Sequence, residues 1–385
     1  MTEELSQEIL DLQRTVRKFA DDVVEPRAMS IDAENVYPED VFKALQSADL
    51  LGLATPEEYG GSGAGTLGLT VAIEEVAKYS NSVALMLLLT RLPVLPLLLA
   101  GSEDQKQRYV ADVATGARRA SFGLSEPHAG SDVSAMRTTA RRDGDGWVLT
   151  GSKCWMSGIE QADYYVVFAR VPEVDNGFGC FIVDRTLDGV SIARVDDKMG
   201  VRGINTGELV LDGVRVSADD VVGQPGKAFK LAMFTLNSMR PIVAARGLGL
   251  AEGALMYAVD YMKSRQAFGA PLTAQQGLGW MVAEHAVQIE AARLLTYRSA
   301  RMVDSGRFDK DSVPFLSAAK LMATETAVSV SNTAMQLLGA AGYMKEHRTE
   351  LYYRDAKQLT IVEGTSQIQK NLIAQAVFGG DLWWA

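Results

Sequence analysis

The stretch "GELVLDGVRV", residues 207–216, decides the fold class, because it sets a strand pattern in a chain otherwise dominated by helical patterns. Its valines and leucines favour extended structure, and Asp-Gly at 212–213 is a common signal for a tight turn. Runs of the same kind fill residues 121–226, and a second turn signal, "DGDG", lies at 143–146. They are "GWVLTG" (146–151), "YYVVFAR" (164–170), "GCFIVD" (179–184) and "GVSIARV" (189–195). This regular spacing predicts a compact antiparallel β-barrel or sandwich.

Helical patterns flank this β-rich middle on both sides. Near the N-terminus, Leu5, Ile9, Leu12 and Val16 recur at spacings of three and four, as on one face of an amphipathic helix. After residue 226, four long runs rich in Ala, Leu and Met (228–265, 275–305, 312–341 and 365–378) indicate a four-helix bundle. We therefore predict a mostly α fold with a β-domain, divided into an N-terminal α-helical domain (1–120), a middle β-domain (121–226) and a C-terminal helical bundle (227–385).

Composition limits the classes of function. The 385 residues are 47% hydrophobic and 22% charged, as in soluble globular proteins, and the net charge of −10 disfavours nucleic acid and anionic membranes as partners. The apolar segment 83–101 is interrupted by Arg91 and by two prolines, which favours buried helices over a membrane span. Two cysteines and three scattered histidines predict neither a disulfide framework nor a metal site, and favour a cytoplasmic protein.

Two loops are candidates for binding a polar or aromatic ligand. "FGLSEPHAGSD" (122–132) offers hydroxyls and backbone N–H groups, although a plain interdomain linker has the same composition. "GSKCWMSG" (151–158) places Trp155 two residues before Ser157. A tryptophan can cover an aromatic cofactor and a nearby hydroxyl can donate to a ring nitrogen, but a core tryptophan is the more common case.

The stretch "IVEGTSQIQK" (361–370) raises the question of what Glu363 does. A glutamate before a helix can simply complement the helix dipole. A carboxylate held away from water can instead act as a base, because burial raises its pKa. Spacing alone leaves both interpretations open, as it does for Arg240, Arg265 and the small-residue segment "QLLGAAGY" (336–343).

Taken in order, the motifs resemble the acyl-CoA dehydrogenase family over nearly the whole chain. The matching segments are "LSEPHAGSD" (124–132), "GSKCWMSG" (151–158), "KMGVRG" (198–203), "GELVLDGVRVSADDVVG" (207–223), "RQAFG" (265–269), "QLLGAAGY" (336–343), "YRDAK" (353–357) and "EGTSQIQK" (363–370). The resemblance implies the three-part fold predicted above, an FAD cofactor, and a homotetramer built as a dimer of dimers.

The resemblance also implies a role for each matching residue. Glu363 falls on the catalytic base, and Gly364 leaves room for the thioester. Ser131 and Arg240 match residues that hold the CoA portion. The implied FAD contacts lie in several segments, of which "RQAFG" and "QLLGAAGY" reach the FAD of a neighbouring subunit: Phe122, Leu124, Ser125, Trp155, Ser157, Arg265, Phe268, Gln336, Gly339, Ala340, Thr365 and Gln367.

The implied chemistry is α,β-dehydrogenation of an acyl thioester. The base removes the Cα proton while the β-hydride passes to flavin N5, and electrons then pass to an electron-transfer flavoprotein. The thioester oxygen gathers negative charge, which in the family is met by a flavin ribityl hydroxyl and by the backbone N–H of the base, here Glu363. Family branches with a relocated base carry it at the position of Met239, which leaves Glu363 as the candidate.

Departures from the family pattern concern the substrate. Asn237 and Met239 replace residues on the CoA side, which leaves open a thioester on an acyl-carrier protein. Val362 stands where the family often has tyrosine. Ala84 and Leu88 indicate an apolar acyl pocket, with Arg91 as the alternative partner of a distal carboxylate.

Two other functions remain open from the sequence. One is a flavin oxidase or monooxygenase of the same fold that uses oxygen. The other is a non-catalytic binding homologue.

Overall fold

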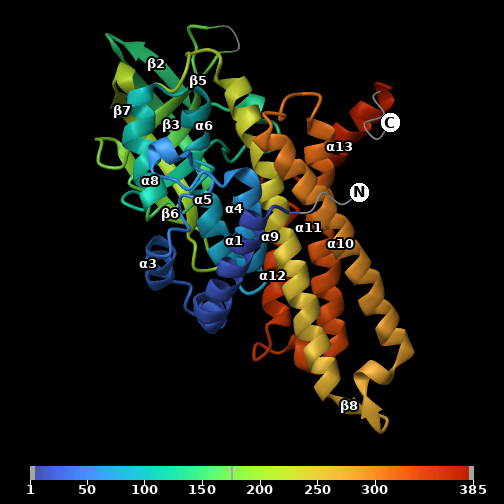
Figure 1. The fold of residues 1–385 in the computed structure, drawn as a ribbon. Coiled ribbons are helices and arrows are strands. Elements are labelled where there is room, and N and C mark those ends of the chain that lie inside the picture. Colours follow the sequence, from blue (N-terminus) through green and yellow to red (C-terminus); the bar gives the residue numbers. More distant parts are fainter. Residues whose placement is uncertain (1–4, 175–176, 381–385) are drawn as a thin grey trace.

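The computed structural model describes residues 5–174 and 177–380 and contains, in chain order, a helical region, a β-sheet region and a second helical region; the two helical regions lie against each other and the sheet lies to one side (Figure 1). The N-terminal region holds α1 to α8: Gln7–Phe19, Ala28–Glu34, Glu39–Ser47, Gly65–Ala77, Asn81–Leu89, Leu95–Ala100, Glu103–Gln105 and Ala111–Thr115. Helices α4 and α5 are mostly apolar and almost entirely buried, as expected for helices at the centre of a domain.

The apolar segment 83–101 folds into α5 and α6, joined by a turn around Pro93. These helices have nine and six residues, far fewer than the roughly 20 that a membrane-spanning helix requires. Helix α9 is long and apolar enough to cross a membrane, but 78% of its most apolar window is buried inside the protein.

The middle region is a single mixed sheet. Its strands are β1 to β7: Ala120–Gly123, Thr139–Asp143, Gly146–Ser157, Tyr164–Arg170, Phe178–Asp184, Val190–Val195 and Thr206–Val216. Their order is β1-β4-β2-β3-β7-β6, and β5 also pairs with β4. Most pairs are antiparallel as predicted, but β1 and β2 both run parallel to β4.

One of the two turn signals was interpreted wrongly. "DGDG" does close a tight hairpin, since Asp143 pairs with Gly146 across β2 and β3. Asp-Gly at 212–213 instead lies inside β7, where the register against β3 shifts between Leu149 and Gly151. Gly213 has φ +65°, the left-handed conformation that a bulge requires and that glycine tolerates.

The C-terminal bundle contains α9 (Ala228–Ser264), α10 (Gln276–Asp304), α11 (Val313–Leu338) and α13 (Ser366–Phe378), close to the four predicted runs. The prediction missed α12 (Thr349–Leu359), whose 11 residues include, apart from its tyrosines, six that are charged or polar: Thr349, Glu350, Arg354, Asp355, Lys357 and Gln358. A small hairpin of β8 (Gln266–Ala267) and β9 (Ala270–Pro271) joins α9 to α10 and lies at the far tip of the bundle (Figure 1).

Candidate active site

Glu363 lies in a short turn between α12 and α13, and this turn has an unusual backbone. Glu363 has φ +50°, which is uncommon for a residue with a side chain, and Gly364 follows with φ +93°. A Cβ on Gly364 would lie 2.6 Å from Nε2 of Gln369, so a larger residue would displace that side chain. Within the described residues, the Glu363 N–H donates to no backbone carbonyl. The turn thus leaves both the carboxylate and the N–H of Glu363 available to a ligand.

Two buried side chains hold this turn in place. Lys320 of α11 donates from Nζ to the carbonyls of Leu359 (2.7 Å) and Gly364 (2.9 Å). Gln369 of α13 donates from Nε2 to the same Gly364 carbonyl at 2.9 Å. Because both side chains are fully buried, the turn is fixed from two helices, which offsets the strain at Glu363.

The environment of Glu363 suits a proton acceptor. Its Oε2 is buried and has no hydrogen-bond partner. Burial raises the pKa of Glu363 to about 7, although the positive charges of Arg246 and Lys320 oppose this rise. A carboxylate with a pKa near neutrality and a free oxygen is poised to accept a proton at physiological pH.

The two candidate ligand loops meet at one edge of the sheet. Cys154 and Trp155 form a bulge in β3, where the register against β7 shifts. Trp155 adopts φ +57°, and its indole is 55% exposed, although an apolar core position is the common place for tryptophan. The Cys154 N–H donates to the Ser125 carbonyl at 3.0 Å, which ties the bulge to loop 122–132. The Trp155 side chain is therefore exposed and is not part of the core.

A buried ion pair supports the same loop from behind. Lys153 Nζ lies 2.7 Å from Glu126 Oε1 and also donates to the Leu124 carbonyl at 3.1 Å. Glu126 accepts further hydrogen bonds from the N–H groups of Arg137 and Thr138. Burial raises the pKa of Glu126, but Lys153 and these hydrogen bonds outweigh it and hold the pKa at about 2. Burial lowers the pKa of Lys153 to about 8 against the attraction of Glu126, so the pair is ionised at neutral pH.

The two residues predicted to hold CoA differ in their exposure. Ser131 lies on the surface, but Arg240 of α9 is buried. Arg240 donates to Ser317 Oγ at 3.0 Å, while its Nε is buried without a partner. Asn237 uses its amide to donate to the Phe308 carbonyl at 3.1 Å. Met239 is fully buried in the apolar core.

The residues predicted to bound the acyl chain share one apolar cluster. Ala84 and Leu88 of α5 and Met239 of α9 are all fully buried in it, and Val362 is a partly buried residue that packs against the cluster. Arg91 donates to the Ala54 carbonyl at 2.7 Å, and burial lowers its pKa to about 10. The surroundings of Val362 are therefore apolar.

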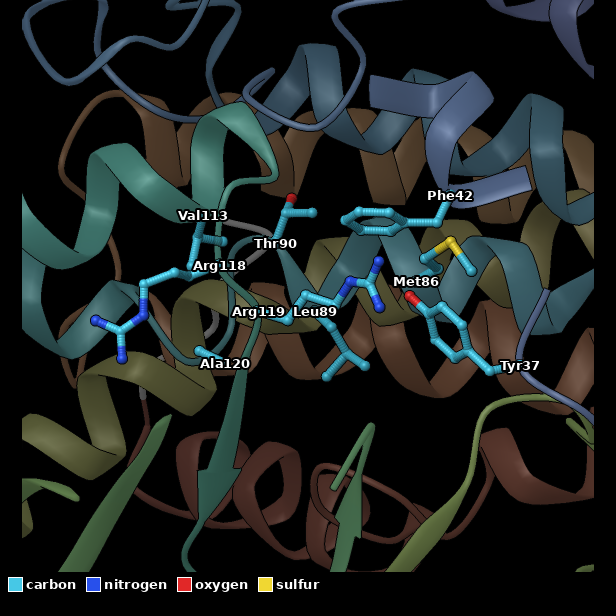
Figure 2. A pocket seen from close by; sticks show the side chains of 9 residues that line it. All are labelled: Tyr37, Phe42, Met86, Leu89, Thr90, Val113, Arg118, Arg119 and Ala120. Atoms are coloured by element: carbon cyan, nitrogen blue, oxygen red, sulfur yellow. The ribbon is translucent and has the colours of Figure 1, made fainter. Parts of the chain in front are cut away.

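A recess lies beside α5, and Phe42 and Met86 of its lining belong to the same apolar cluster (Figure 2). Its lining comprises Tyr37, Phe42, Met86, Leu89, Thr90, Val113, Arg118, Arg119 and Ala120. Arg119 lies 3.8 Å from the ring centre of Phe42 and forms an ion pair with Glu39 at 2.6 Å. Glu363 does not line this recess, so the recess is not the candidate active site.

Family comparison accounts for almost the whole chain. Models described as the N-terminal, middle and C-terminal domains of acyl-CoA dehydrogenase match residues 6–117, 121–214 and 226–378. The chain belongs to the acyl-CoA dehydrogenase family. It is therefore an oxidoreductase of a flavoprotein family that uses FAD.

Individual acyl-CoA dehydrogenases agree with this placement. A protein named "Probable acyl-CoA dehydrogenase fadE25" from Mycobacterium leprae is 38% identical and covers 97% of this chain and 96% of its own length. The structure of butyryl-CoA dehydrogenase from Megasphaera elsdenii superposes with a TM-score of 0.94, at 34% identity over 98% and 100% of the two chains. Glutaryl-CoA dehydrogenase from Mycobacterium smegmatis in complex with FADH2 has a TM-score of 0.91, at 26% identity over 97% and 95%.

One chain does not bring all the expected acyl-CoA dehydrogenase site residues together. Arg265 follows α9 at its end, about 28 Å along the helix from Arg246, which interacts electrostatically with Glu363. Phe268, at the tip of the β8–β9 hairpin, is 96% exposed with φ +56°. Gln336, Gly339 and Ala340 are exposed at the end of α11. Thr365 caps α13 by accepting from the Ile368 N–H, and Gln367 is exposed.

Three charged residues near the predicted site were missed by the sequence reasoning. Arg246 is 1% exposed, donates to Asn81 at 2.8 Å and to Gln358 at 2.9 Å, and acts electrostatically on Glu363. Lys320 supports the Glu363 turn. Lys198 Nζ lies 3.3 Å from the hydroxyl of Thr206, which in turn lies 3.5 Å from the hydroxyl of Ser157. Arg246 and Lys320 share one sequence feature that could have drawn attention to them. Each is a lone cation among small apolar residues of a helix, in "VAARGLG" (243–249) and "SAAKLMA" (317–323).

Proposed function

We propose that the protein catalyses FAD-dependent α,β-dehydrogenation of an acyl-CoA, with Glu363 as the base. The observation that carries the proposal is the buried, unpartnered Oε2 of Glu363 beside two buried cations. The family placement supports the reaction class, and the protein's own geometry supports the choice of this carboxylate.

The residues present fit a flavin. Three features lie together at one sheet edge: the exposed indole of Trp155, the Ser157 hydroxyl, and loop 122–125, whose Ser125 carbonyl accepts the Cys154 N–H. They offer stacking and hydrogen bonding to an aromatic ring system. Gly339, with φ +63° and open space around its Cα, permits close approach of a phosphate group. When bound, FAD supplies the acceptor for the hydride that leaves the β-carbon.

The chain's own residues handle the proton and the oxygen of the thioester. Glu363 takes the Cα proton on Oε2, and its uncommitted N–H donates to the thioester oxygen as negative charge develops there. Lys320 and Gln369 keep the two groups in place by holding the Gly364 carbonyl. Arg246 and Lys320 limit the rise in the pKa of Glu363, which keeps a useful fraction ionised at neutral pH.

The pH dependence of kcat/KM follows from this pKa. Because the pKa of Glu363 is raised from its usual value to about 7, the base is protonated and inactive below that pH. We expect kcat/KM to fall about tenfold per pH unit below roughly pH 7, as measured by dye-linked assays from pH 5 to 9.

Asp355 is the control for this profile, because burial also raises its pKa to about 7. It accepts the Val201 N–H at 2.5 Å, a role that asparagine can keep. Asp355→Asn should retain the acidic limb. If the fall of kcat/KM below pH 7 disappears in Asp355→Asn, the titration of Glu363 is not its cause.

The apolar surroundings of Val362 support a short, uncharged acyl group. Val362 packs against the apolar cluster that contains Ala84, Leu88 and Met239, and Arg91 donates to the Ala54 carbonyl. The similar butyryl-CoA dehydrogenase acts on a substrate of this kind by its name. Rates of flavin reduction with acyl-CoA and acyl-carrier thioesters of two to twelve carbons test both the acyl length and the carrier.

We further propose a homotetramer in which a neighbour completes the site. Trp280, Val287 and Leu294 lie seven residues apart along α10 and are 61%, 70% and 50% exposed. An apolar stripe of this kind is a usual mark of a protein interface. It lies in the same part of the bundle as Phe268, whose ring also has no cover in a single chain.

Val287→Glu should therefore break the assembly. A charge in the apolar stripe is costly to desolvate, so we expect a smaller species by light scattering and loss of most bound FAD, because Arg265 and Phe268 of a neighbour are withdrawn. Val36→Glu is the matched control, since Val36 is 64% exposed on the N-terminal region. An unchanged mass for Val287→Glu would show that α10 is not an interface.

Electron-transfer flavoprotein is the proposed acceptor of the electrons. Reoxidation of the substrate-reduced protein by that partner, with little peroxide formed in air, is the expected result. Rapid peroxide formation would favour an oxidase. A purified protein whose flavin no thioester reduces would favour a non-catalytic homologue.

A further inference from the structure

Three polar side chains form a chain that ends at Ser157. Lys198 Nζ donates to the Ile204 carbonyl and lies 3.3 Å from Thr206 Oγ1. Thr206 Oγ1 lies 3.5 Å from Ser157 Oγ. Thr206 is buried, and Lys198 and Ser157 are half-buried, so the chain runs from a half-buried cation through a buried hydroxyl to a hydroxyl at the edge of the candidate flavin site.

The chain has a preferred direction. A lysine ammonium can only donate, so it directs a hydrogen at Thr206 Oγ1 and turns the hydroxyl proton of Thr206 away from itself. That proton then points to Ser157 Oγ, and hydrogen bonds in such a chain polarise one another in the same sense. The proton of Ser157 is consequently left to point outward, toward a ligand.

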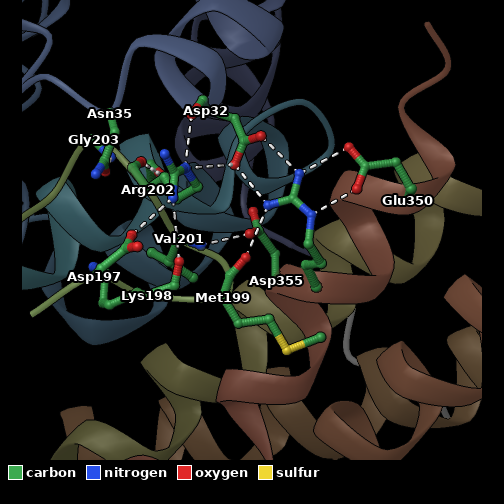
Figure 3. A network of polar contacts seen from close by, with 12 residues as sticks. Asp32, Asn35, Asp197, Lys198, Met199, Val201, Arg202, Gly203, Glu350 and Asp355 are labelled. Carbon is green, nitrogen blue, oxygen red and sulfur yellow. Dashed lines mark hydrogen bonds and ion pairs between the residues drawn. The ribbon is translucent and has the colours of Figure 1, made fainter. Parts of the chain in front are cut away.

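The loop that carries Lys198 is fixed from several sides (Figure 3). Asp355 accepts from the Val201 N–H at 2.5 Å, and Asn35 accepts from the Gly203 N–H at 3.1 Å. Arg202 donates to the Asp32 carbonyl at 2.9 Å. These contacts come from α2, from the turn after it and from α12, so the amine is held in position before any ligand arrives.

The charges around Lys198 keep it a donor at neutral pH. Burial lowers its pKa to about 8, and the attraction of Asp355 and Asp196 opposes the repulsion from Arg246 and Arg202. Most of the amine is therefore charged at pH 7.

We propose that Lys198 is a positioning residue that acts through Thr206 to orient the Ser157 hydroxyl as a hydrogen-bond donor to N5 of the flavin. The inference rests on the proposed function, because it requires FAD beside Ser157. Lys198 itself touches neither flavin nor substrate.

The test uses 5-deaza-FAD, which carries a C–H group in place of N5 and cannot accept this hydrogen bond. The holoenzyme is equilibrated by dialysis with an equimolar mixture of FAD and 5-deaza-FAD, and the flavins then bound are quantified by mass spectrometry. A donor at N5 should make the wild type prefer FAD about five- to tenfold, the usual contribution of one hydrogen bond. Ser157→Ala should bring this preference to about one.

Lys198→Met should lower the preference for FAD toward one, and adding it to Ser157→Ala should have no further effect. Thr206→Val, which leaves Lys198 in place, should act in the same way, and Lys198→Arg should retain most of the preference. Lys18→Met is the control, since Lys18 is an exposed lysine paired with Asp22. If Lys198 had only a structural role, Lys198→Met would weaken the binding of both flavins equally and leave the preference for FAD unchanged.

The outcomes separate this inference from the proposed function. If the wild type prefers FAD and the Lys198→Met variant prefers FAD to the same degree as the wild type, only the role of Lys198 is overturned. A wild type that binds neither flavin overturns the proposed function, and the inference falls with it. A wild type that binds both flavins equally overturns the contact between Ser157 and N5, and with it the role of Lys198.

Discussion

Replacing Glu363 by glutamine is expected to lower the rate of flavin reduction by acyl-CoA about 10²- to 10⁴-fold while leaving FAD bound. Glutamine keeps the size of the side chain but cannot accept the Cα proton. The turn should persist, because Lys320 and Gln369 hold the carbonyl of Gly364 and not the carboxylate. Anaerobic stopped-flow mixing with butyryl-CoA measures the rate directly.

Two further variants sharpen this prediction. Glu363→Asp shortens the reach of the base and should give an intermediate rate. Glu346→Gln is the matched control, because Glu346 is an exposed glutamate near the start of α12. Wild-type rates in Glu363→Gln would move the base to another residue.

The second large effect is expected for stability, in the ion pair behind the flavin loop. Glu126→Gln leaves Lys153 as a buried cation without its counter-charge, and such a change costs about 3–5 kcal/mol of unfolding free energy. Both side chains are at most 2% exposed, so solvent screens the pair little. Chemical denaturation followed by the fluorescence of Trp147 and Trp155, both in β3, measures the loss.

The pH dependence of this loss has a defined sign. Because the pKa of Glu126 is lowered to about 2, its stabilising effect is fully present above its usual pKa of 4.5 and is lost as the pH falls through 2. The difference between Glu126→Gln and the wild type should therefore be largest near neutral pH. The double variant Glu126→Gln with Lys153→Met should recover part of the stability, and equal stability of wild type and Glu126→Gln would refute the argument.

The fold was largely predictable because its signals are local. Long runs rich in Ala, Leu and Met marked α9, α10, α11 and α13, and β-branched runs marked the strands. The α12 helix escaped because many of its residues are charged or polar and it packs through a few buried positions such as Leu351 and Tyr352. The Asp-Gly pair at 212–213 was misplaced, because a bulge and a turn require the same left-handed glycine and only the partner strand distinguishes them.

The candidate site was less predictable, because it depends on burial and on contacts between distant segments. Glu363 was proposed from the family motif, whereas its raised pKa and its unpartnered Oε2 arise from burial, which the sequence does not show. Arg246 and Lys320 could not be assigned from sequence, since a lone cation in an apolar helix does not show what it faces. The roles of Arg265 and Phe268 stay a prediction, because they depend on a neighbouring chain. The boundaries of the three regions at residues 120 and 226 also stay a prediction.

The central claim is that this protein removes a proton and a hydride from neighbouring carbons of an acyl-CoA. The most direct measurement mixes the purified yellow protein with one equivalent of butyryl-CoA without oxygen, and follows both the flavin colour and the mass of the thioester. The account predicts bleaching and an enoyl-CoA that has lost two hydrogens. A flavin that stays yellow with butyryl-CoA and with every other thioester, or a bleached flavin with no enoyl product, would contradict it.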